Sequence, residues 1–213
     1  MPTAAAPSGP PRNVPGVTAL ILASASPARL NTLRNAGIEP EVIVSNVDES
    51  VVDSTDPAEV SGTLARLKAE AVAAQCQGRP ALVLGCDSVL AFDSRVLGKP
   101  ADAADARARW QRMRGRAGVL HTGHCLIDTA TGKRAAAVAA TTVHFADVSD
   151  AEIDAYVATG EPLHVAGAFT IDGIGSAFVT RIEGDHGTVV GLSMPLLRDL
   201  LASLGVPLTT LWG

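Results

Sequence analysis

The stretch from Leu20 to Gly37, LILASASPARLNTLRNAG, constrains the fold more than any other part of the chain. An apolar run at residues 18–23 has the composition of a buried strand. Ser26 is a favourable N-cap, and Pro27 suits the first helical position because its missing N–H would have no partner there. Leucines at helical spacing follow, and Gly37 provides a stop. The stretch therefore predicts a strand, a turn of small residues and a helix.

This construction predicts an anion site at the start of the helix. Backbone N–H groups and the positive end of the helix dipole would meet there, which suits a phosphate. Arg29 falls at about the third helical position, where an unbalanced cation costs roughly 0.3–1 kcal/mol and a bound anion would reverse that sign. Alternatively, its guanidinium extends into solvent or pairs with a distant carboxylate. The turn matches neither GxxxxGK(S/T) nor GxGxxG, so neither a P-loop nor a dinucleotide-binding fold is indicated.

The composition limits the class of protein. The 213 residues are 47% hydrophobic, enough for a substantial core in one large or two small domains. A formal net charge of -5 argues against nucleic-acid polymers and membrane surfaces as partners. No apolar run approaches the ~18 residues that span a membrane. The cysteines Cys76, Cys86 and Cys125 lack CxxC spacing, which favours reduced thiols in a cytoplasmic protein.

The first seventeen residues differ from the rest of the chain. They are rich in Pro, Ala and Gly, and they lack the basic start and apolar centre of a signal peptide. We therefore expect residues 1–17 to form a flexible N-terminal tail. No linker divides the remainder, so we expect one domain over residues 18–213.

Alternating strand and helix patterns predict the fold class. The predicted strands are 41–45, 80–90, 96–97, 119–128, 135–145 and 178–183, and the later helices are 57–76, 101–113, 149–159 and 195–204. The apolar stripe expected on the long helix is Val60, Leu64, Leu67, Ala71 and Ala74, with Lys68 beside it. This order predicts an α/β (α+β) fold, a mixed β-sheet flanked by helices, and leaves open a cleft between two lobes.

Two acids are candidates for chemistry. Asp87 follows the most apolar strand pattern in the chain, and we expect it at the end of that strand. A carboxylate there requires a cation, a metal or a ligand, unless it caps a turn. Glu49 lies in an acidic loop after another predicted strand, where it could share a magnesium ion with substrate phosphates or be solvated.

The basic candidates are less specific. Lys99, flanked by glycine and proline, could reach a phosphate or lie exposed at a hairpin end. Lys68 could serve the same ligand or extend from the helix edge into solvent. His121 and His124 would face opposite ways in a strand, and we interpret both as structural. Together with Arg29 and the two acids, the lysines fit metal-assisted attack of water on a phosphate ester or anhydride.

A series of short motifs covers nearly the whole chain after the tail. They are Ser24-x-Ser26-Pro27-x-Arg29, Val47-Asp48-Glu49, Ala65-x-x-Lys68-Ala69, Cys86-Asp87-Ser88, Leu97-Gly98-Lys99-Pro100, Gly160-Glu161-Pro162, Ala166-Gly167, Ile171-Asp172-Gly173, Ile182-Glu183-Gly184-Asp185 and Val190-Gly191-Leu192. In this order they resemble the Maf family. No single motif is specific, but the ordered set is.

The resemblance implies a fold, a reaction and partners. Maf proteins are nucleoside triphosphate pyrophosphatases that cleave between the α- and β-phosphates of an NTP or dNTP, with a divalent cation such as Mg²⁺ or Mn²⁺. Such an enzyme would clear non-standard nucleotides. The implied fold is Maf/ITPase-like, with two lobes around a cleft, and because members are often dimeric a homodimer is expected.

The resemblance also implies roles for individual residues. Asp87 would be the proton acceptor that activates water, and it would share the metal with Glu49. The residues implied to bind the substrate phosphates are Ser24, Arg29, Lys68 and Lys99.

Three positions implied to select the base depart from the best-known subgroups. Ala28, Ser88 and Asp172 stand where relatives specific for dTTP and UTP carry Arg, Thr and Gln, and where relatives specific for 7-methyl-GTP carry Trp, Gln and Glu. Alanine neither hydrogen-bonds nor stacks, and an ionised Asp172 only accepts hydrogen bonds. We therefore expect a roomier pocket that disfavours uracil and thymine.

A second function remains open. Maf proteins have also been described as inhibitors of septum formation, which would make this chain a nucleotide-binding regulator of cell division that acts by protein contact with little turnover. The retained Asp87 and the two lysines favour the enzyme, since binding alone requires no base.

Overall fold

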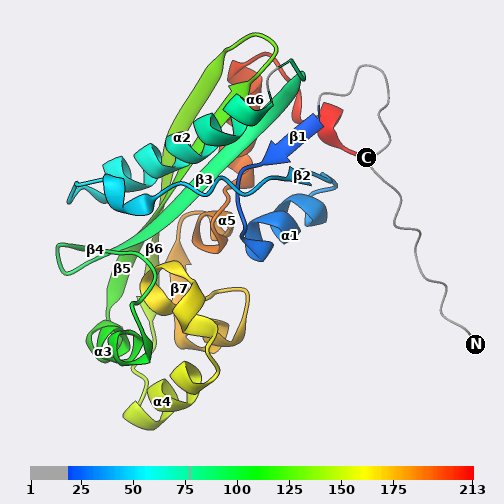
Figure 1. Cartoon of the computed structure of the whole chain (residues 1–213). Coiled ribbons are helices and arrows are strands. Elements are labelled where there is room, and N and C mark those ends of the chain that lie inside the picture. The colour runs from blue at the N-terminus through cyan, green and yellow to red at the C-terminus, as the bar shows by residue number, and fades with distance from the viewer. Residues whose placement is uncertain (1–18, 77) are drawn as a thin grey trace, which may run out of the picture.

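The computed structural model describes residues 19–76 and 78–213 (Figure 1). The expected tail of residues 1–17 and the first domain residue lie outside the described part. The described residues form one seven-stranded mixed sheet in the order β2-β1-β3-β5-β6-β7, with β4 paired to β3. The strands are β1 Ala19–Leu22, β2 Glu41–Val42, β3 Ala81–Phe92, β4 Arg95–Leu97, β5 Ala117–Asp128, β6 Arg134–Phe145 and β7 Val179–Glu183. Strand β1 runs parallel to β2 and β3, and the other pairs are antiparallel, which confirms the predicted mixed α/β sheet.

The helices are α1 Pro27–Asn35, α2 Pro57–Gln75, α3 Ala103–Met113, α4 Asp150–Ala158, α5 His186–Val190 and α6 Met194–Ser203. Two of them, α1 and α4, begin at the caps that the sequence predicts. Ser26 caps α1, and Ser149 with Glu152 forms the complete capping box of α4. The short helix α5 was not predicted, because five residues are too few for a helical period to show.

Helices cover both faces of the sheet because strand side chains alternate between them. Ile21 of β1 and Val83 of β3 pack against α2 on one face. Leu20 and Leu22 pack with α1 and α6 on the other. Figure 1 shows α2 lying across the near side of β3.

The long strands extend into a second lobe. Strands β3, β5 and β6 have 12 residues each. Around their far ends, α3 and α4 enclose a cluster centred on Trp110, which meets Phe145, Tyr156 and Phe178 edge to face at ring-centroid distances of 5.6 Å. In Figure 1 this lobe lies at the opposite end of the sheet from α6.

Two predictions about elements were wrong in detail. The strand predicted at 41–45 covers only Glu41–Val42, because its partner β1 ends at Leu22. On α2, Leu67 is half-buried and Ala74 is exposed. The buried residues of α2 are Val60, Ser61, Leu64, Ala65, Lys68, Ala69 and Val72, so Lys68 lies on the buried face and does not extend from its edge.

None of the helices within residues 19–76 and 78–213 combines the length and the apolar content that crossing a bilayer requires.

Candidate active site

The site opens where β3 has no neighbouring strand on one edge. Strand β1 pairs with residues 81–84 of β3, and β4 pairs with residues 90–92 on the same side. Between them lie Asp87 and Ser88. Asp87 was expected at the end of the strand, and this was wrong: it lies in the middle of β3, opposite Gly123 of β5. The apolar pattern of β3 is interrupted at Asp87 because its neighbour β1 ends before this point, although β3 itself continues.

Two glycines let α2 approach the sheet closely at this point. A Cβ on Gly85 would lie 2.2 Å from the carbonyl oxygen of Ala65, and a Cβ on Gly123 would lie 2.2 Å from that of Ser61. Any side chain there would push α2 away. Because Asp87 is two residues beyond Gly85, it points to the same face, under α2.

Lys68 of α2 joins the two predicted acids. Its Nζ donates to Asp87 Oδ1 at 2.5 Å and to Glu49 Oε1 at 2.7 Å. The Asp87 and Lys68 side chains are only 9% and 11% exposed, whereas that of Glu49 is 51% exposed. Burial raises the pKa of Asp87 above its ordinary value, and the Lys68 ammonium opposes this only in part. Asp87 is thus a buried carboxylate of raised basicity held by one ammonium.

Arg29 turns back from α1 into the same cleft. Its guanidinium donates to Gly191 O at 2.8 Å, and to the hydroxyls of Ser24 and Ser88 at 3.1 Å each. These partners are neutral, and no carboxylate lies within ion-pairing distance of Arg29 in the described residues. The two alternatives for Arg29 therefore do not apply: its guanidinium neither extends into solvent nor pairs with a distant carboxylate. Its positive charge is available to an anion.

Ser24 and Ser88 differ in whether their hydroxyl groups already donate a hydrogen bond. Thr122 donates its proton to Thr188 O, so in the 2.9 Å contact between Ser88 and Thr122 it is Ser88 that donates. Ser24 Oγ accepts from the Ser26 amide and from Arg29, which leaves its own O–H able to donate to a ligand. Ser88 therefore orients Arg29, and Ser24 keeps a free proton.

The backbone contributes less to the anion site than the sequence suggests. Pro27 has no N–H, and the Arg29 amide is taken by the Ser26 hydroxyl at 3.4 Å. The site relies on the Arg29 charge more than on a row of free amides.

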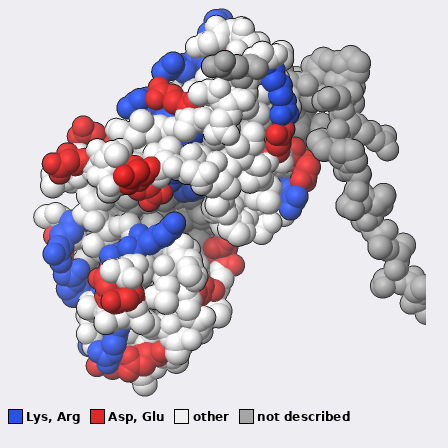
Figure 2. All heavy atoms as spheres, viewed as in Figure 1, with Lys and Arg blue, Asp and Glu red and all other residues white. Residues whose placement is uncertain are grey.

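A cleft of about 910 Å³ brings all the predicted site residues together. Ser24, Ala28, Arg29, Glu49, Lys68, Asp87, Ser88, Lys99 and Asp172 all line it. Figure 2 shows acidic and basic side chains interspersed over one face of the molecule, without a broad basic patch on that face. The cleft thus combines a carboxylate pair with a local group of cations.

Sequence reasoning missed two residues that support the cleft. Glu161 accepts hydrogen bonds from Thr170, Ile174 and Gly175 in the loop that carries Asp172. In the sequence, only the Gly160-Glu161-Pro162 motif pointed to it. Arg109 of α3 donates to Gly98 O at 2.7 Å and so holds the turn before Lys99. Nothing in the sequence distinguishes Arg109, because it is one of several arginines on a helix where arginine side chains are usually solvated.

His124 has the structural role that the sequence suggests. It is buried, and its Nε2 accepts from the Ser193 amide at 2.9 Å. Its Nδ1 therefore carries the proton and donates to Thr122 O at 3.0 Å. Burial lowers its pKa to about 4, so the ring is neutral.

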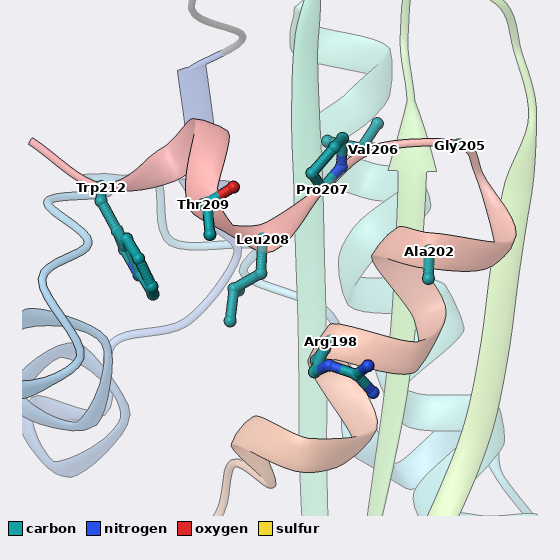
Figure 3. Close-up of a pocket in the computed structure, with 8 residues that line it drawn as sticks. All are labelled: Arg198, Ala202, Gly205, Val206, Pro207, Leu208, Thr209 and Trp212. Atoms are coloured by element: carbon teal, nitrogen blue, oxygen red, sulfur yellow. The ribbon is translucent and has the colours of Figure 1, made fainter.

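A second hollow lies near the C-terminus, between α6 and the turn Leu208–Leu211 (Figure 3). Its volume is about 680 Å³, and its lining runs from Arg198 and Ala202 to Trp212. Among the described residues of that lining Arg198 is the one ionisable side chain, so they offer no carboxylate for acid–base chemistry. The candidate active site is therefore the first cleft.

The sequence is similar to proteins of a known family. The family model described as "Maf-like protein" matches residues 19–204. The chain is similar to a nucleoside triphosphate pyrophosphatase of Salinispora tropica, with 66% identity over 91% of this chain and 87% of the relative. It is also similar to a protein of that name in Streptomyces coelicolor, with 60% identity over 91% of this chain and 94% of the relative.

Among solved structures, the chain matches a nucleoside-triphosphatase / dITP/XTP pyrophosphatase of Mycobacterium abscessus. The identity is 14%, the TM-score is 0.41, and the match covers 88% of this chain and 95% of the other.

Proposed function

The chain belongs to the Maf family, and from that premise we propose that it is a nucleoside triphosphate pyrophosphatase that converts an NTP or dNTP into the monophosphate and pyrophosphate. The observation that carries the proposal is the buried Asp87–Lys68 pair in a cleft lined by Arg29 and Lys99. The names of the similar proteins support the same reaction. We place the activity in the cytoplasm, where Cys76, Cys86 and Cys125 would stay reduced.

Asp87 is the proposed proton acceptor. A water oxygen bonds to the α-phosphorus, and its proton passes to the Asp87 carboxylate. The bond between the α-phosphorus and the bridging oxygen breaks, and its electron pair leaves with pyrophosphate. The raised pKa makes this carboxylate a stronger base than an exposed aspartate. Lys68 fixes its orientation.

The donor set fits a divalent cation. Glu49 and Asp87 reach the same Lys68 Nζ at 2.7 and 2.5 Å, so their oxygens converge. Magnesium is commonly held by one or two carboxylates together with substrate phosphates. In residues 19–76 and 78–213 no group of three or more His, Cys, Asp and Glu converges, so the other ligands would come from substrate and water. When bound, the cation would polarise the phosphoryl oxygens.

The cations and Ser24 are the proposed phosphate-binding set. Arg29 offers an uncompensated guanidinium, and Lys99 stands exposed in the turn after β4. Ser24 offers the O–H that its two incoming hydrogen bonds leave free. Lys68 would divide its donors between the two acids and a phosphate oxygen.

Base selection is proposed to rest on Ala28 and Asp172. Both line the cleft, and Asp172 is exposed and able to accept hydrogen bonds. A carboxylate facing the base favours amino groups, as in cytosine and guanine, over bare carbonyl edges. Ser88 contributes less than its position suggests, because its proton is given to Thr122. We expect kcat/KM to be lower for UTP and dTTP than for CTP and GTP.

The deciding experiment measures pyrophosphate release from the eight common NTPs and dNTPs and from 7-methyl-GTP, with Mg²⁺, with Mn²⁺ and with chelator. We expect metal-dependent release of pyrophosphate and a monophosphate, without free orthophosphate. An exclusive preference for dTTP and UTP would remove Asp172 from base selection. Nucleotide binding without turnover on the whole panel would favour the regulator of cell division.

A further inference from the structure

The carboxylate of Glu161 is enclosed by the loop that carries Asp172. Its Oε1 accepts hydrogen bonds from the Tyr156 hydroxyl at 2.9 Å, from the Thr170 hydroxyl at 2.5 Å and from the Gly175 amide at 2.9 Å. Its Oε2 accepts from the Ile174 amide at 2.9 Å. Although burial acts to raise it, these donors hold the pKa of Glu161 below its ordinary value. The ionised carboxylate is thus the acceptor around which residues 170–175 are arranged.

The loop is fitted closely to this carboxylate. A Cβ on Gly173 would lie 2.5 Å from Glu161 Oε2, and a Cβ on Gly175 would lie 2.4 Å from the Tyr156 hydroxyl. Tyr156 itself is 2% exposed and packs edge to face against Trp110 and Phe178. Glu161 therefore ties the loop to the rigid core of the second lobe.

The wall formed by this segment differs in charge from the rest of the cleft. Within residues 161–173, the lining includes Glu161, His164, Val165, Ala166, Phe169 and Asp172, and it contains neither lysine nor arginine. The lysines and arginine of the cleft lie on α1, α2 and the turn after β4. A triphosphate would lie against those cations, because the carboxylates of the wall repel it. The nucleoside end would then face the wall.

We propose that Glu161 is a positioning residue that sets the nucleoside-facing wall and thereby determines how well the site discriminates between bases. The proposal rests on the proposed function. Glu161 acts through Asp172 and its neighbours, which its hydrogen bonds to Ile174 and Gly175 hold in place. If Glu161 Oε2 could no longer accept from the Ile174 amide, the loop of residues 170–175 would lose this attachment. The contacts of Asp87, Lys68 and Arg29 would remain.

The test is Glu161→Gln in the full-length protein, with Glu183→Gln as a matched control. Glutamine keeps the size of the side chain but presents an NH₂ group to the Ile174 amide, so one hydrogen bond becomes a repulsion. We expect KM to rise about tenfold and the ratio of kcat/KM between the best and worst base to fall by a similar factor, with kcat changed less than threefold. Glu183 lies exposed on β7 and contacts His144 and Arg181, so its variant should behave as wild type.

A second pair of variants protects the test against a folding failure. Thr170→Val removes one donor to Glu161, whereas Thr170→Ser keeps the hydroxyl. The valine variant should shift KM and base discrimination further than the serine variant, with similar melting temperatures. Wild-type KM and base discrimination in both Glu161→Gln and Thr170→Val would overturn the proposal, as would a loss confined to kcat.

A readout without turnover separates this proposal from the proposed function. Hydrogen exchange of the peptide that contains residues 170–175 should be faster by about tenfold in Glu161→Gln than in the control. Binding of a non-hydrolysable α,β-methylene nucleotide should weaken in parallel. If the wild type releases no pyrophosphate, the proposed function fails, and these two measurements still decide the role of Glu161. Unchanged exchange and binding would refute it.

Discussion

At the scale of the residue, the site depends on one buried ion pair. Asp87 and Lys68 are separated by 19 residues, and their atoms lie 2.5 Å apart. Removing one partner of a buried pair leaves the other uncompensated, which destabilises proteins by about 3–5 kcal/mol. Here Glu49 would remain beside Lys68 after a change at Asp87. Function and stability can therefore be separated at this position.

We predict that Asp87→Asn lowers kcat by about 10²–10⁴-fold, because asparagine cannot accept the proton of the attacking water. Affinity for a non-hydrolysable nucleotide should change little, since Arg29 and Lys99 are intact. Single-turnover kinetics and calorimetry measure the two effects. Asp93→Asn, in the exposed turn before β4, is the control. A variant that keeps more than about a tenth of the wild-type kcat would remove Asp87 from the mechanism.

We predict that the folded protein loses stability in mild acid because His124 is buried in its neutral form. Its pKa is about 4 in the folded protein and about 6.5 in the unfolded chain. Below pH 6.5 the unfolded chain gains a proton that the folded protein does not, so stability falls as the pH decreases from 6.5 to 4. Between pH 7 and pH 5 the wild type should lose about 2 kcal/mol more than His124→Gln.

Urea unfolding at the two pH values measures this difference. His186→Gln, at the exposed start of α5, serves as the control and should keep the wild-type pH dependence. Equal losses in the wild type and His124→Gln would mean that the ring is not held neutral.

At the scale of the element, α3 holds the turn that carries Lys99. Arg109 donates to Gly98 O at 2.7 Å and to Asp105 Oδ2 at 2.6 Å. Gly98 O also accepts from the Gly167 amide at 3.1 Å, so the two loops on this side of the cleft share one carbonyl. The turn that carries Lys99 is thereby attached to α3 and to the facing loop.

We predict that Arg109→Lys raises KM for the triphosphate about fivefold to tenfold, because Arg109 reaches Gly98 O and Asp105 through two separate guanidinium nitrogens and the shorter lysine offers a single ammonium. The free energy of unfolding should fall by about 1–2 kcal/mol. Steady-state kinetics and urea unfolding measure the two effects. Arg107→Lys, two residues earlier on the same helix and paired with exposed Asp154, is the control. A wild-type KM in Arg109→Lys would show that Lys99 needs no such support.

At the scale of the whole molecule, one sheet serves two lobes. The shared strands β3 and β5 pair over ten positions from Leu82 to Ala91, so both walls of the cleft rest on one hydrogen-bonded ladder. The cleft is a gap along one edge of this ladder, and it requires no hinge between separate domains. The homodimer that the resemblance implies stays a prediction.

We predict that deletion of residues 1–17 leaves kcat/KM within about twofold of wild type and the free energy of unfolding within about 0.5 kcal/mol. These residues contain few large apolar side chains, so they have little apolar surface to bury. Kinetics and thermal unfolding of the shortened chain measure the effect. Lost folding or activity would assign the segment a role in the domain.

The sequence by itself determined what short-range physics controls. Caps such as Ser26 and Ser149 set where helices begin, and alternating or continuous apolar runs set the strands. These signals depend on hydrogen bonds and side-chain periods within a few residues, so they can be recognised without knowing the fold. The ordered motifs likewise identified the family and named the residues that the cleft brings together.

Only the tertiary structure decided how those residues interact. Asp87 meets Lys68 because Gly85 and Gly123 let α2 touch the sheet. Arg29 is oriented by Gly191, which lies 162 residues further along the chain. Glu161 appears as an ordinary loop acid until four donors converge on it. Ion pairs and hydrogen bonds between distant segments are set by the packing of helix on sheet, and that packing leaves no local pattern in the sequence.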